Sequence, residues 1–175
     1  MSSDSEFVPL NIAVLTVSDT RDENSDSSGK FLLEALTGAG HSLADKQIVK
    51  DDIYQIRAVM SAWIYREDVQ VVLVTGGTGF SGRDSTPEAV SVLFDKQIDG
   101  FGEVFRARSL QEIGSSTIQS RALAGLANNT VIFCVPGSTG ACKTAWHGVI
   151  CEQLDSRHRP CNFVGVLKTR QDMEA

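Results

Sequence analysis

The segment between Val69 and Glu88, VQVVLVTGGTGFSGRDSTPE, constrains the fold more than any other part of the sequence. An apolar run of the kind that forms a buried strand leads into a glycine-rich loop, and Pro87 favours the first turn of a helix after it. Strand, glycine loop and helix in this order present backbone N–H groups to an anion, most often a phosphate. We therefore expect one βα unit with an anion site at the loop.

Apolar runs alternate with amphipathic stretches along most of the chain. Alternating strands and helices are typical of βα units, in which helices cover both faces of a mainly parallel sheet. The sequence predicts a single-domain, three-layer α/β/α fold over residues 10–167, with flexible tails at 1–9 and 168–175. Strands are expected at 11–17, 42–49, 69–74 and 130–135, and helices at 30–39, 53–65, 87–94, 101–113, 118–127 and 140–154.

The composition is that of an ordinary globular protein, and it limits the partners. A length of 175 residues suits one domain, and a net charge of -6 argues against a general DNA or RNA binder. No apolar run approaches the ~20 residues that cross a bilayer, and the polar start MSSDSEF does not resemble a signal peptide. We predict no nucleic-acid or membrane partner. The widely spaced cysteines, at positions 134, 142, 151 and 161, are expected to be reduced, mostly buried thiols of a cytoplasmic protein.

Four of the expected strands end in glycine, serine or acidic residues. In parallel sheets, ligands bind beyond the carboxyl ends of the strands, at a switch in strand order. We therefore expect one site where these strand ends meet. The strand ends are Ser18-Asp19, Lys50-Asp51-Asp52, Thr75-Gly76-Gly77-Thr78-Gly79 and Pro136-Gly137-Ser138.

Acidic residues at two of these loops are candidate metal ligands. Pro87 at the first helical position makes Thr86 the expected N-cap, which leaves Asp84 free to face the loop. A carboxylate beside a phosphate loop becomes useful when a divalent cation lies between the two. Asp52 is expected to cap the helix that follows it, whereas Asp51 is either a site residue or a solvated loop acid.

Each of these motifs also has a purely structural explanation. The glycines can form a tight turn, and Ser138 can cap the last helix with or without a ligand nearby. Residues 77–82 match the GxGxxG fingerprint of dinucleotide-binding proteins, but a loop with Arg83 and Asp84 separates them from the helix, and no acid-tipped strand follows. The sequence shows no obvious covalent nucleophile, so a transfer reaction would use an attacking group on the substrate.

Several motifs together resemble the MoaB/MogA family of molybdenum cofactor biosynthesis proteins. The most specific of them is TGGTG followed closely by a D-x-T-P turn, and the resemblance extends from about Leu10 to Leu167. The segments that carry it are IAVLTVSD (12–19), DSSG (26–29), VVLVTGGTG (71–79), RDSTPE (83–88), FGEVFR (101–106) and PGST (136–139).

The resemblance implies a MogA-like fold, assembly into homotrimers or homohexamers, and a pocket for molybdopterin. In the adenylyltransferase branch, the terminal phosphate of molybdopterin attacks the α-phosphorus of Mg-ATP and pyrophosphate leaves. The family's two functional acids match Asp51 and Asp84, so both are predicted to be catalytic and to hold Mg²⁺. Phosphate contacts are expected from Thr75, Gly76, Gly77, Thr78 and Gly79, and pterin or nucleotide contacts from Ser18, Asp19, Gly137 and Ser138.

One position departs from the catalytic branch, in which a proline often precedes the first functional acid. Lys50 occupies that place here. The leading hypothesis is an enzyme that adenylylates molybdopterin, and the presence of both Asp51 and Asp84 favours it. The alternatives are a non-catalytic molybdopterin carrier and, from the GxGxxG match, a nicotinamide-dependent enzyme.

Overall fold

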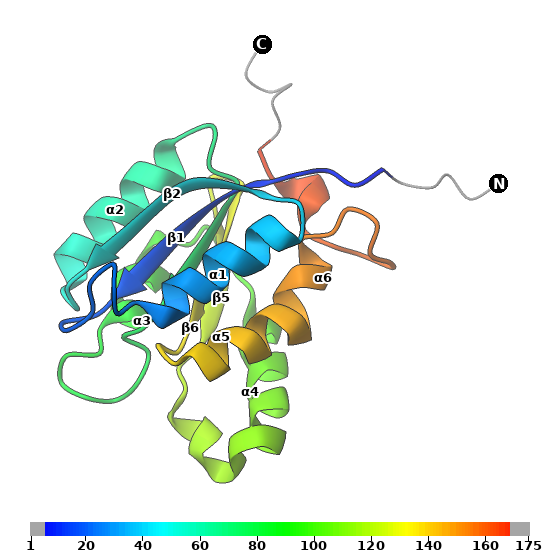
Figure 1. Ribbon diagram of the computed structural model, residues 1–175. Helices are drawn as coiled ribbons and strands as arrows, with labels where there is room; N and C mark the ends of the chain where they lie inside the picture. The colour runs from blue at the N-terminus through cyan, green and yellow to red at the C-terminus, as the bar shows by residue number, and fades with distance from the viewer. Residues whose placement is uncertain (1–5, 169–175) are drawn as a thin grey trace.

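A six-stranded sheet forms the centre of the protein, seen in a computed structural model that describes residues 6–168 (Figure 1). The strands are β1 (Asn11–Val17), β2 (Ser42–Val49), β3 (Val71–Thr75), β4 (Lys96–Gln97), β5 (Leu123–Ala127) and β6 (Thr130–Val135). Their order across the sheet is β2-β1-β3-β6-β5-β4. The neighbours β2 and β1, β1 and β3, and β3 and β6 pair in parallel. The pairs of β6 with β5 and of β5 with β4 are antiparallel.

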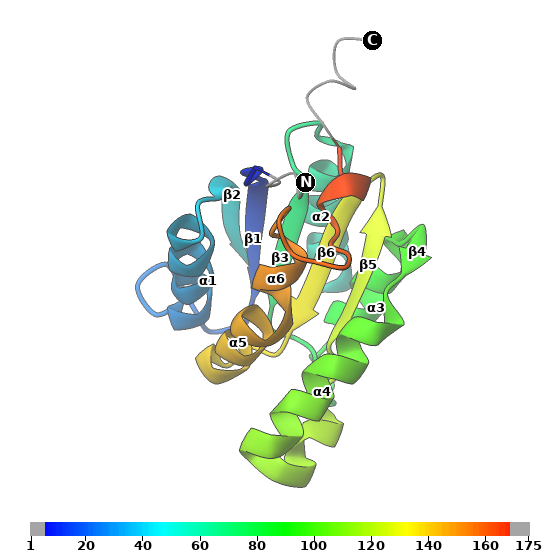
Figure 2. The same ribbon diagram turned by 90° about the vertical axis from the view of Figure 1, so that its right-hand side faces the viewer.

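Helices cover both faces of the sheet, as Figure 2 shows. They are α1 (Ser27–Gly38), α2 (Ile53–Tyr65), α3 (Thr86–Val90), α4 (Asp99–Ile113), α5 (Thr139–Ala145) and α6 (Cys151–Gln153), with 3₁₀ turns η1 (Ser91–Leu93), η2 (Gly114–Gln119) and η4 (Val164–Val166) and a π-helical turn η3 (Trp146–Ile150). Ile12 and Val14 of β1 pack in one core with α1, α4 and α5, while Ala13 and Leu15 pack in a second core with α2 and α3. This alternation is expected of a strand buried on both faces. The predicted three-layer α/β/α fold with a mainly parallel sheet is confirmed.

The segment 118–127 is not the helix that its apolar spacing predicted. Its first part belongs to η2, and its second part is β5, which pairs antiparallel with β6. Asn128 and Asn129 have φ angles of 47° and 55° and form the two-residue turn between these strands, a turn that favours a hairpin. Gly125 suits the strand because the ring of Phe94 lies where a Cβ would be. The prediction was wrong because strand pairing overrode a short apolar pattern.

The start of α3 differs by one residue from the prediction. Ser85, rather than Thr86, occupies the N-cap position, and the Thr86 hydroxyl donates to the carbonyl of Gly76 (2.7 Å) instead. The prediction that Asp84 is not the cap is confirmed. Asp52 caps α2 as predicted, because its carboxylate accepts two backbone N–H groups of the first turn (3.0 and 2.9 Å).

Two other helices differ from their predicted forms. α1 begins at Ser27, ahead of the predicted residue 30, because the Asp26 carboxylate accepts the N–H of Gly29 (2.9 Å) and caps the helix there. The predicted helix at 140–154 is interrupted by the π-helical turn η3.

The predicted tails, 1–9 and 168–175, lie mostly outside the described residues. Where they are described, they contact the domain. The N–H of Val8 donates to Ser156 Oγ (2.9 Å), and Lys168 Nζ donates to two carbonyls at the end of α2 (2.6 and 2.8 Å).

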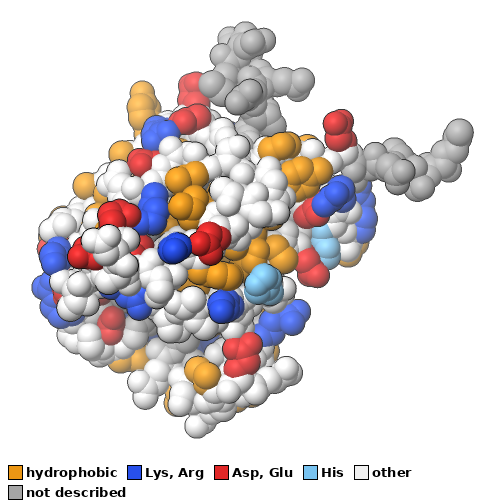
Figure 3. Space-filling model, in the orientation of Figure 1, with side chains coloured by type: hydrophobic (Ala, Val, Ile, Leu, Met, Phe, Trp, Pro, Cys, Tyr) orange, Lys and Arg blue, Asp and Glu red, His pale blue; other side chains and the backbone are white. Residues whose placement is uncertain are grey.

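The surface carries charges of both signs. On the face drawn in Figure 3, acidic and basic side chains are interspersed. Between residues 6 and 168, no helix is long and apolar enough to cross a membrane. The four cysteines are free: Cys134 and Cys142 are buried, Cys151 is half-buried and Cys161 is exposed.

Candidate functional site

A cavity of about 480 Å³ opens at the carboxyl ends of the parallel strands. β1 lies between β2 and β3, so the strand order reverses at β1: the chain moves to one side of β1 to form β2 and then to the other side to form β3. At such a reversal the loops beyond the strands diverge and leave room for a ligand. All of the predicted site residues line this cavity: Ser18, Asp19, Asp51, Thr75, Gly76, Gly77, Thr78, Gly79, Asp84, Gly137 and Ser138. The fold thus brings together residues from four distant parts of the sequence.

The loop after β3 packs directly on the neighbouring strands. Gly76 and Gly77 have φ angles of 105° and 66°, a region that favours glycine. A Cβ on Gly76 would lie 2.1 Å from the carbonyl oxygen of Val17, at the end of β1. The N–H of Gly76 donates to the carbonyl of Val135 (3.0 Å), and the Thr75 hydroxyl donates to the carbonyl of the residue that follows β6 (3.0 Å). Thr75 and Gly76 therefore hold the loop in place.

The next amides of the loop are the ones available to an anion. Within residues 6–168, the N–H groups of Gly77, Thr78 and Gly79 donate no backbone hydrogen bond. An anion-binding loop needs such free N–H groups. The expectation that Gly76 N–H and the Thr75 hydroxyl also hold phosphate does not fit, because both already donate within the protein.

Asp51 is fixed by contacts from a distant loop. It follows β2 and is only 8% exposed. Its Oδ1 accepts from the N–H and from the hydroxyl of Ser85 (3.0 and 2.6 Å). Its Oδ2 lies 2.7 Å from the position that a Cβ on Gly77 would take. Asp51 is therefore not a solvated loop acid: it is held against the glycine loop.

Asp84 lies against the same loop, two residues further on. Its Oδ2 accepts from the N–H of Ser81 (2.8 Å) and lies 2.8 Å from the position that a Cβ on Gly79 would take. Arg121 holds the same segment from outside, because its guanidinium donates to the carbonyls of Gly79 (2.9 Å) and Asp84 (3.1 Å) and pairs with the carboxylate of Glu88.

Asp19 ties the loop after β1 to the loop before α3. Its carboxylate accepts from Nε and Nη2 of Arg83 (2.9 and 2.8 Å) and from the N–H of Asp51 (3.2 Å). The hydrogen bond from Arg83 lowers the pKa of Asp19 to about 2, from an ordinary value of 3.8. Lys50 donates from Nζ to the carbonyl of Asp19 (2.6 Å).

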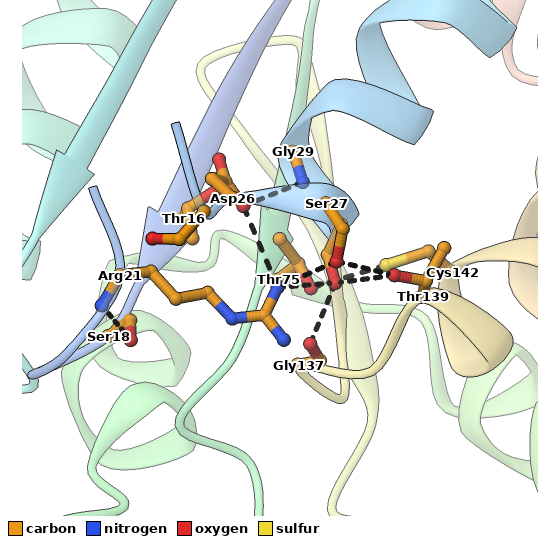
Figure 4. A network of polar contacts seen from close by, with 12 residues as sticks. Thr16, Ser18, Arg21, Asp26, Ser27, Gly29, Thr75, Gly137, Thr139 and Cys142 are labelled. Atoms are coloured by element: carbon orange, nitrogen blue, oxygen red, sulfur yellow. Dashed lines mark hydrogen bonds and ion pairs between the residues drawn. The ribbon is translucent and has the colours of Figure 1, made fainter. Parts of the chain in front are cut away.

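Hydroxyl groups link the loops on the other side of the cavity (Figure 4). Ser18 Oγ accepts the N–H of Arg21 (3.1 Å), whose guanidinium donates to Ser28 Oγ (3.1 Å). Ser28 Oγ in turn donates to the carbonyl of Gly137 (2.8 Å). Ser138 caps α5, as the structural explanation predicted, because its Oγ accepts the N–H of the third residue along (3.1 Å).

Sequence reasoning missed two groups of cavity residues. The first is basic: Arg21 and Arg83 line the cavity. Arg83 precedes Asp84 in the RDSTPE segment, so its place beside a predicted acid was the available clue. The second group forms a wall of the cavity and comes from α4, η2 and the residue after η2: Phe105, Ser109, Ile113, Ser116, Gln119 and Ser120.

The carboxylates of Asp51 and Asp84 are oxygen donors of the kind that Mg²⁺ takes. Within the described chain, the hydrogen bonds to each carboxylate go to one oxygen, which leaves the other for a cation. Mg²⁺ usually takes one or two carboxylates and completes its shell with phosphate and water. No cluster of three or more His, Cys, Asp or Glu side chains suited to a metal occurs in residues 6–168, so these two carboxylates would supply only part of a cation's shell.

Comparison with known proteins identifies the family. A family model described as "Probable molybdopterin binding domain" matches residues 13–156. Molybdenum cofactor biosynthesis protein B of Escherichia coli (strain K12) is 58% identical over 163 residues, which cover 93% of this chain and 96% of that protein. The chain belongs to the MoaB/MogA family.

Solved structures of MoaB proteins have the same fold. A crystal structure of a molybdenum cofactor biosynthesis protein B is 47% identical, with a TM-score of 0.81, and the match covers 84% of this chain and 92% of that one. The tungsten cofactor synthesizing protein MoaB from Pyrococcus furiosus is 37% identical, with a TM-score of 0.72 and coverage of 79% and 89%. The span matched by the family model contains every cavity residue predicted from the sequence.

Proposed function

We propose that this protein binds molybdopterin and adenylylates its terminal phosphate with Mg-ATP, releasing pyrophosphate. The observation that supports this most is the placement of Asp51 and Asp84 against Gly77 and Gly79 of one loop, whose N–H groups are free to donate to an anion. Family membership supports molybdopterin as the ligand. The two acids beside a loop suited to phosphate support a nucleotide bound with a metal ion.

The reaction needs positioning and charge neutralisation more than a protein nucleophile. A phosphate oxygen of molybdopterin forms a bond to the α-phosphorus of ATP, and the bond between that phosphorus and the bridging oxygen to the β-phosphate breaks. The N–H groups of Gly77, Thr78 and Gly79 orient the phosphates and stabilise the charge on the equatorial oxygens. Asp51 and Asp84 would hold a magnesium ion, which would offset the negative charge of the phosphates beside the two carboxylates.

The wall from α4 and η2 suits a pterin. Ile113, which is 55% exposed, offers apolar surface above the buried Phe105, while Gln119 offers groups that donate and accept hydrogen bonds. A flat ring system with a polar edge needs both kinds of contact. We propose that the ring system lies against this wall and that its phosphate reaches toward the glycine loop.

We also propose that the protein acts as a homotrimer or homohexamer in the cytoplasm. Side chains of α4 and η2 that carry exposed apolar surface support an assembly: Val104, Leu110, Ile113 and Ile118 are 44–74% exposed. The free cysteines fit a reducing compartment. Light scattering coupled to size-exclusion chromatography measures the mass of the assembly, and a monomer at all concentrations contradicts the proposal.

Pyrophosphate release tests the reaction. Purified protein with molybdopterin, ATP and Mg²⁺ should release pyrophosphate, and Asp84→Asn should slow release about a hundredfold, equivalent to about 3 kcal/mol, while pterin binding is kept. Asp68→Asn is the matched control, because Asp68 pairs with Arg66 outside the cavity. Normal pterin binding without turnover by the wild type would instead identify a molybdopterin carrier.

A further inference from the structure

Arg83 and Asp19 form a bidentate ion pair on the exposed rim of the cavity. Both side chains line the cavity, and the Arg83 side chain is 65% exposed. The two hydrogen bonds, 2.9 and 2.8 Å, use Nε and Nη2 of the guanidinium and both oxygens of the carboxylate. The pair joins the loop after β1 to the loop before α3. Both of these loops also bind Asp51, through Asp19 and Ser85.

The cavity has an excess of acid for a ligand that is itself an anion. Asp19, Asp51 and Asp84 line it, against the cations Arg21 and Arg83. Arg83 neutralises Asp19, so even with a divalent cation at Asp51 and Asp84 a polyphosphate would gain little further positive charge unless a basic side chain turned toward the ligand.

Arg83 is the cavity cation best placed to turn. The Arg21 guanidinium is tied to Ser27 and Ser28 hydroxyls and lies near the buried carboxylate of Asp26 (3.9 Å). Arg121, nearby, is engaged by two carbonyls and a carboxylate. The described hydrogen bonds of Arg83, in contrast, all go to one partner on the surface, and exposed pairs of this kind are readily exchanged.

We propose that Arg83 is a polyphosphate-binding residue of this site and that Asp19 is its resting partner, which the ligand's phosphate replaces. A guanidinium presents the same fork of N–H groups to a phosphate as to a carboxylate, so the exchange conserves its hydrogen bonds. Asp19 keeps the N–H of Asp51 after the exchange, so the loop after β1 stays attached. This assignment rests on the proposed nucleotide site, and it gives Asp19 a role in competition with the ligand in place of direct contact.

Binding of inorganic pyrophosphate in the presence of Mg²⁺, measured by titration calorimetry, tests the proposal without any turnover. Arg83→Ala should weaken pyrophosphate binding about tenfold or more, and Arg83→Lys should restore part of the loss, because lysine keeps the charge without the fork. Asp19→Asn should tighten binding severalfold, because the neutral amide no longer competes for Arg83 while its oxygen still accepts the N–H of Asp51.

A second ion pair in the same chain provides the matched control. Arg157 donates from Nε and Nη2 to Asp155 (2.9 and 2.8 Å), with the arginine 56% exposed, outside the cavity. Arg157→Ala and Asp155→Asn change charge and geometry in the same way, and they should leave pyrophosphate affinity unchanged. Thermal unfolding of all variants checks that each is folded.

Two outcomes would overturn the proposal. Wild-type affinity in Arg83→Ala, or no pyrophosphate binding by the wild type at millimolar concentrations, would remove Arg83 from the site. Weaker binding in Asp19→Asn, by as much as in Arg83→Ala, would make Asp19 a contact that supports the ligand. This test is independent of the adenylylation test. If the wild type binds pyrophosphate without adenylylating molybdopterin, and Arg83→Ala weakens that binding, then the assignment of Arg83 holds and only the proposed reaction fails.

Discussion

Asp51 and Asp84 lie against the same loop, but they are held in different ways. Asp51 is buried at the end of β2, and its oxygen is bound by Ser85, 34 residues away. Asp84 is in a surface loop and is bound by Ser81, three residues away. One acid is placed by the packing of the sheet and its helices, and the other by a short local turn that Arg121 secures from outside.

The side of the site that contains Asp51 is therefore part of the folded core, whereas the loop that contains Asp84 depends on local contacts. A carboxylate fixed by long-range contacts is ordered whenever the protein is folded. A carboxylate on an exposed loop depends on contacts that can open locally, since such segments have low local stability. The comparison predicts that changes near Asp51 alter both stability and the reaction, whereas changes near Asp84 alter the reaction with little effect on stability.

Removing either acid tests this with the largest expected effect. Asp51→Asn and Asp84→Asn should each slow pyrophosphate release about a hundredfold, or about 3 kcal/mol. Asp51→Asn should also lower the free energy of unfolding by about 1–2 kcal/mol, because the Ser85 hydroxyl and N–H lose a charged acceptor. Asp84→Asn should leave that free energy almost unchanged. Urea unfolding measures it, and equal destabilisation by the two changes contradicts the comparison.

Adding one methyl group beneath each acid is the next largest test. Gly77→Ala should destabilise the fold by about 2 kcal/mol, because φ is 66° and the new Cβ would meet Thr86 Oγ1 at 2.4 Å and Asp51 Oδ2 at 2.7 Å. A Cβ on Gly79 would meet the side chain of Asp84, which lies in a surface loop, at 2.8 Å from Oδ2. Gly79→Ala should keep stability and lower the rate, which thermal unfolding and initial rates measure side by side.

Replacing Arg121 by lysine probes the outer support of Asp84. A lysine cannot donate to the carbonyls of Gly79 and Asp84 and to the carboxylate of Glu88 in one fixed geometry. Arg121→Lys should speed hydrogen exchange of the N–H of Ser81 about tenfold, equivalent to about 1.4 kcal/mol of local opening. The N–H of Ser85, which Asp51 accepts, should exchange at the wild-type rate. Acceleration of both would show that the loop is one rigid unit.

The smallest effect is expected from single hydroxyl groups. Ser85→Ala removes one hydrogen bond to Asp51 and should cost about 1 kcal/mol of stability. Ser81→Ala is its matched control, because Ser81 holds Asp84 through its backbone N–H, which alanine retains. A loss of stability in Ser81→Ala equal to that in Ser85→Ala would contradict the distinction between the two acids.

The sequence predicted the parts of the site that follow from strand order. β1, β2 and β6 were predicted with the bounds that the structure has, and their ends carry the residues that meet at the cavity. Parallel strands must place their carboxyl ends at one edge, so this convergence needs no side-chain detail. Asp52 as a cap follows from an equally local rule.

The rest depends on contacts that no local pattern contains. The pairing of β5 with β6 turned a predicted helix into a strand, and the Asn128-Asn129 turn was the overlooked clue. The engagement of Gly76 N–H by Val135 requires knowledge of which strand lies beside β3. Arg121 reaches the loop from beyond η2, and spacing in the sequence does not reveal such a contact.

Because Asp51 packs on Gly77 and Asp84 packs on Gly79, the glycine loop influences the distance between the two carboxylates. Residues two apart have Cα atoms at most about 7 Å from each other, so one dipeptide step fixes how far apart the carboxylates are supported. Inserting a residue between these glycines would change the separation of the two carboxylates while keeping both aspartates in the sequence. An insertion between Gly79 and Asp84 would disrupt the turn in which the N–H of Ser81 binds Asp84, so both the step from Gly77 to Gly79 and this turn set the separation of the two carboxylates.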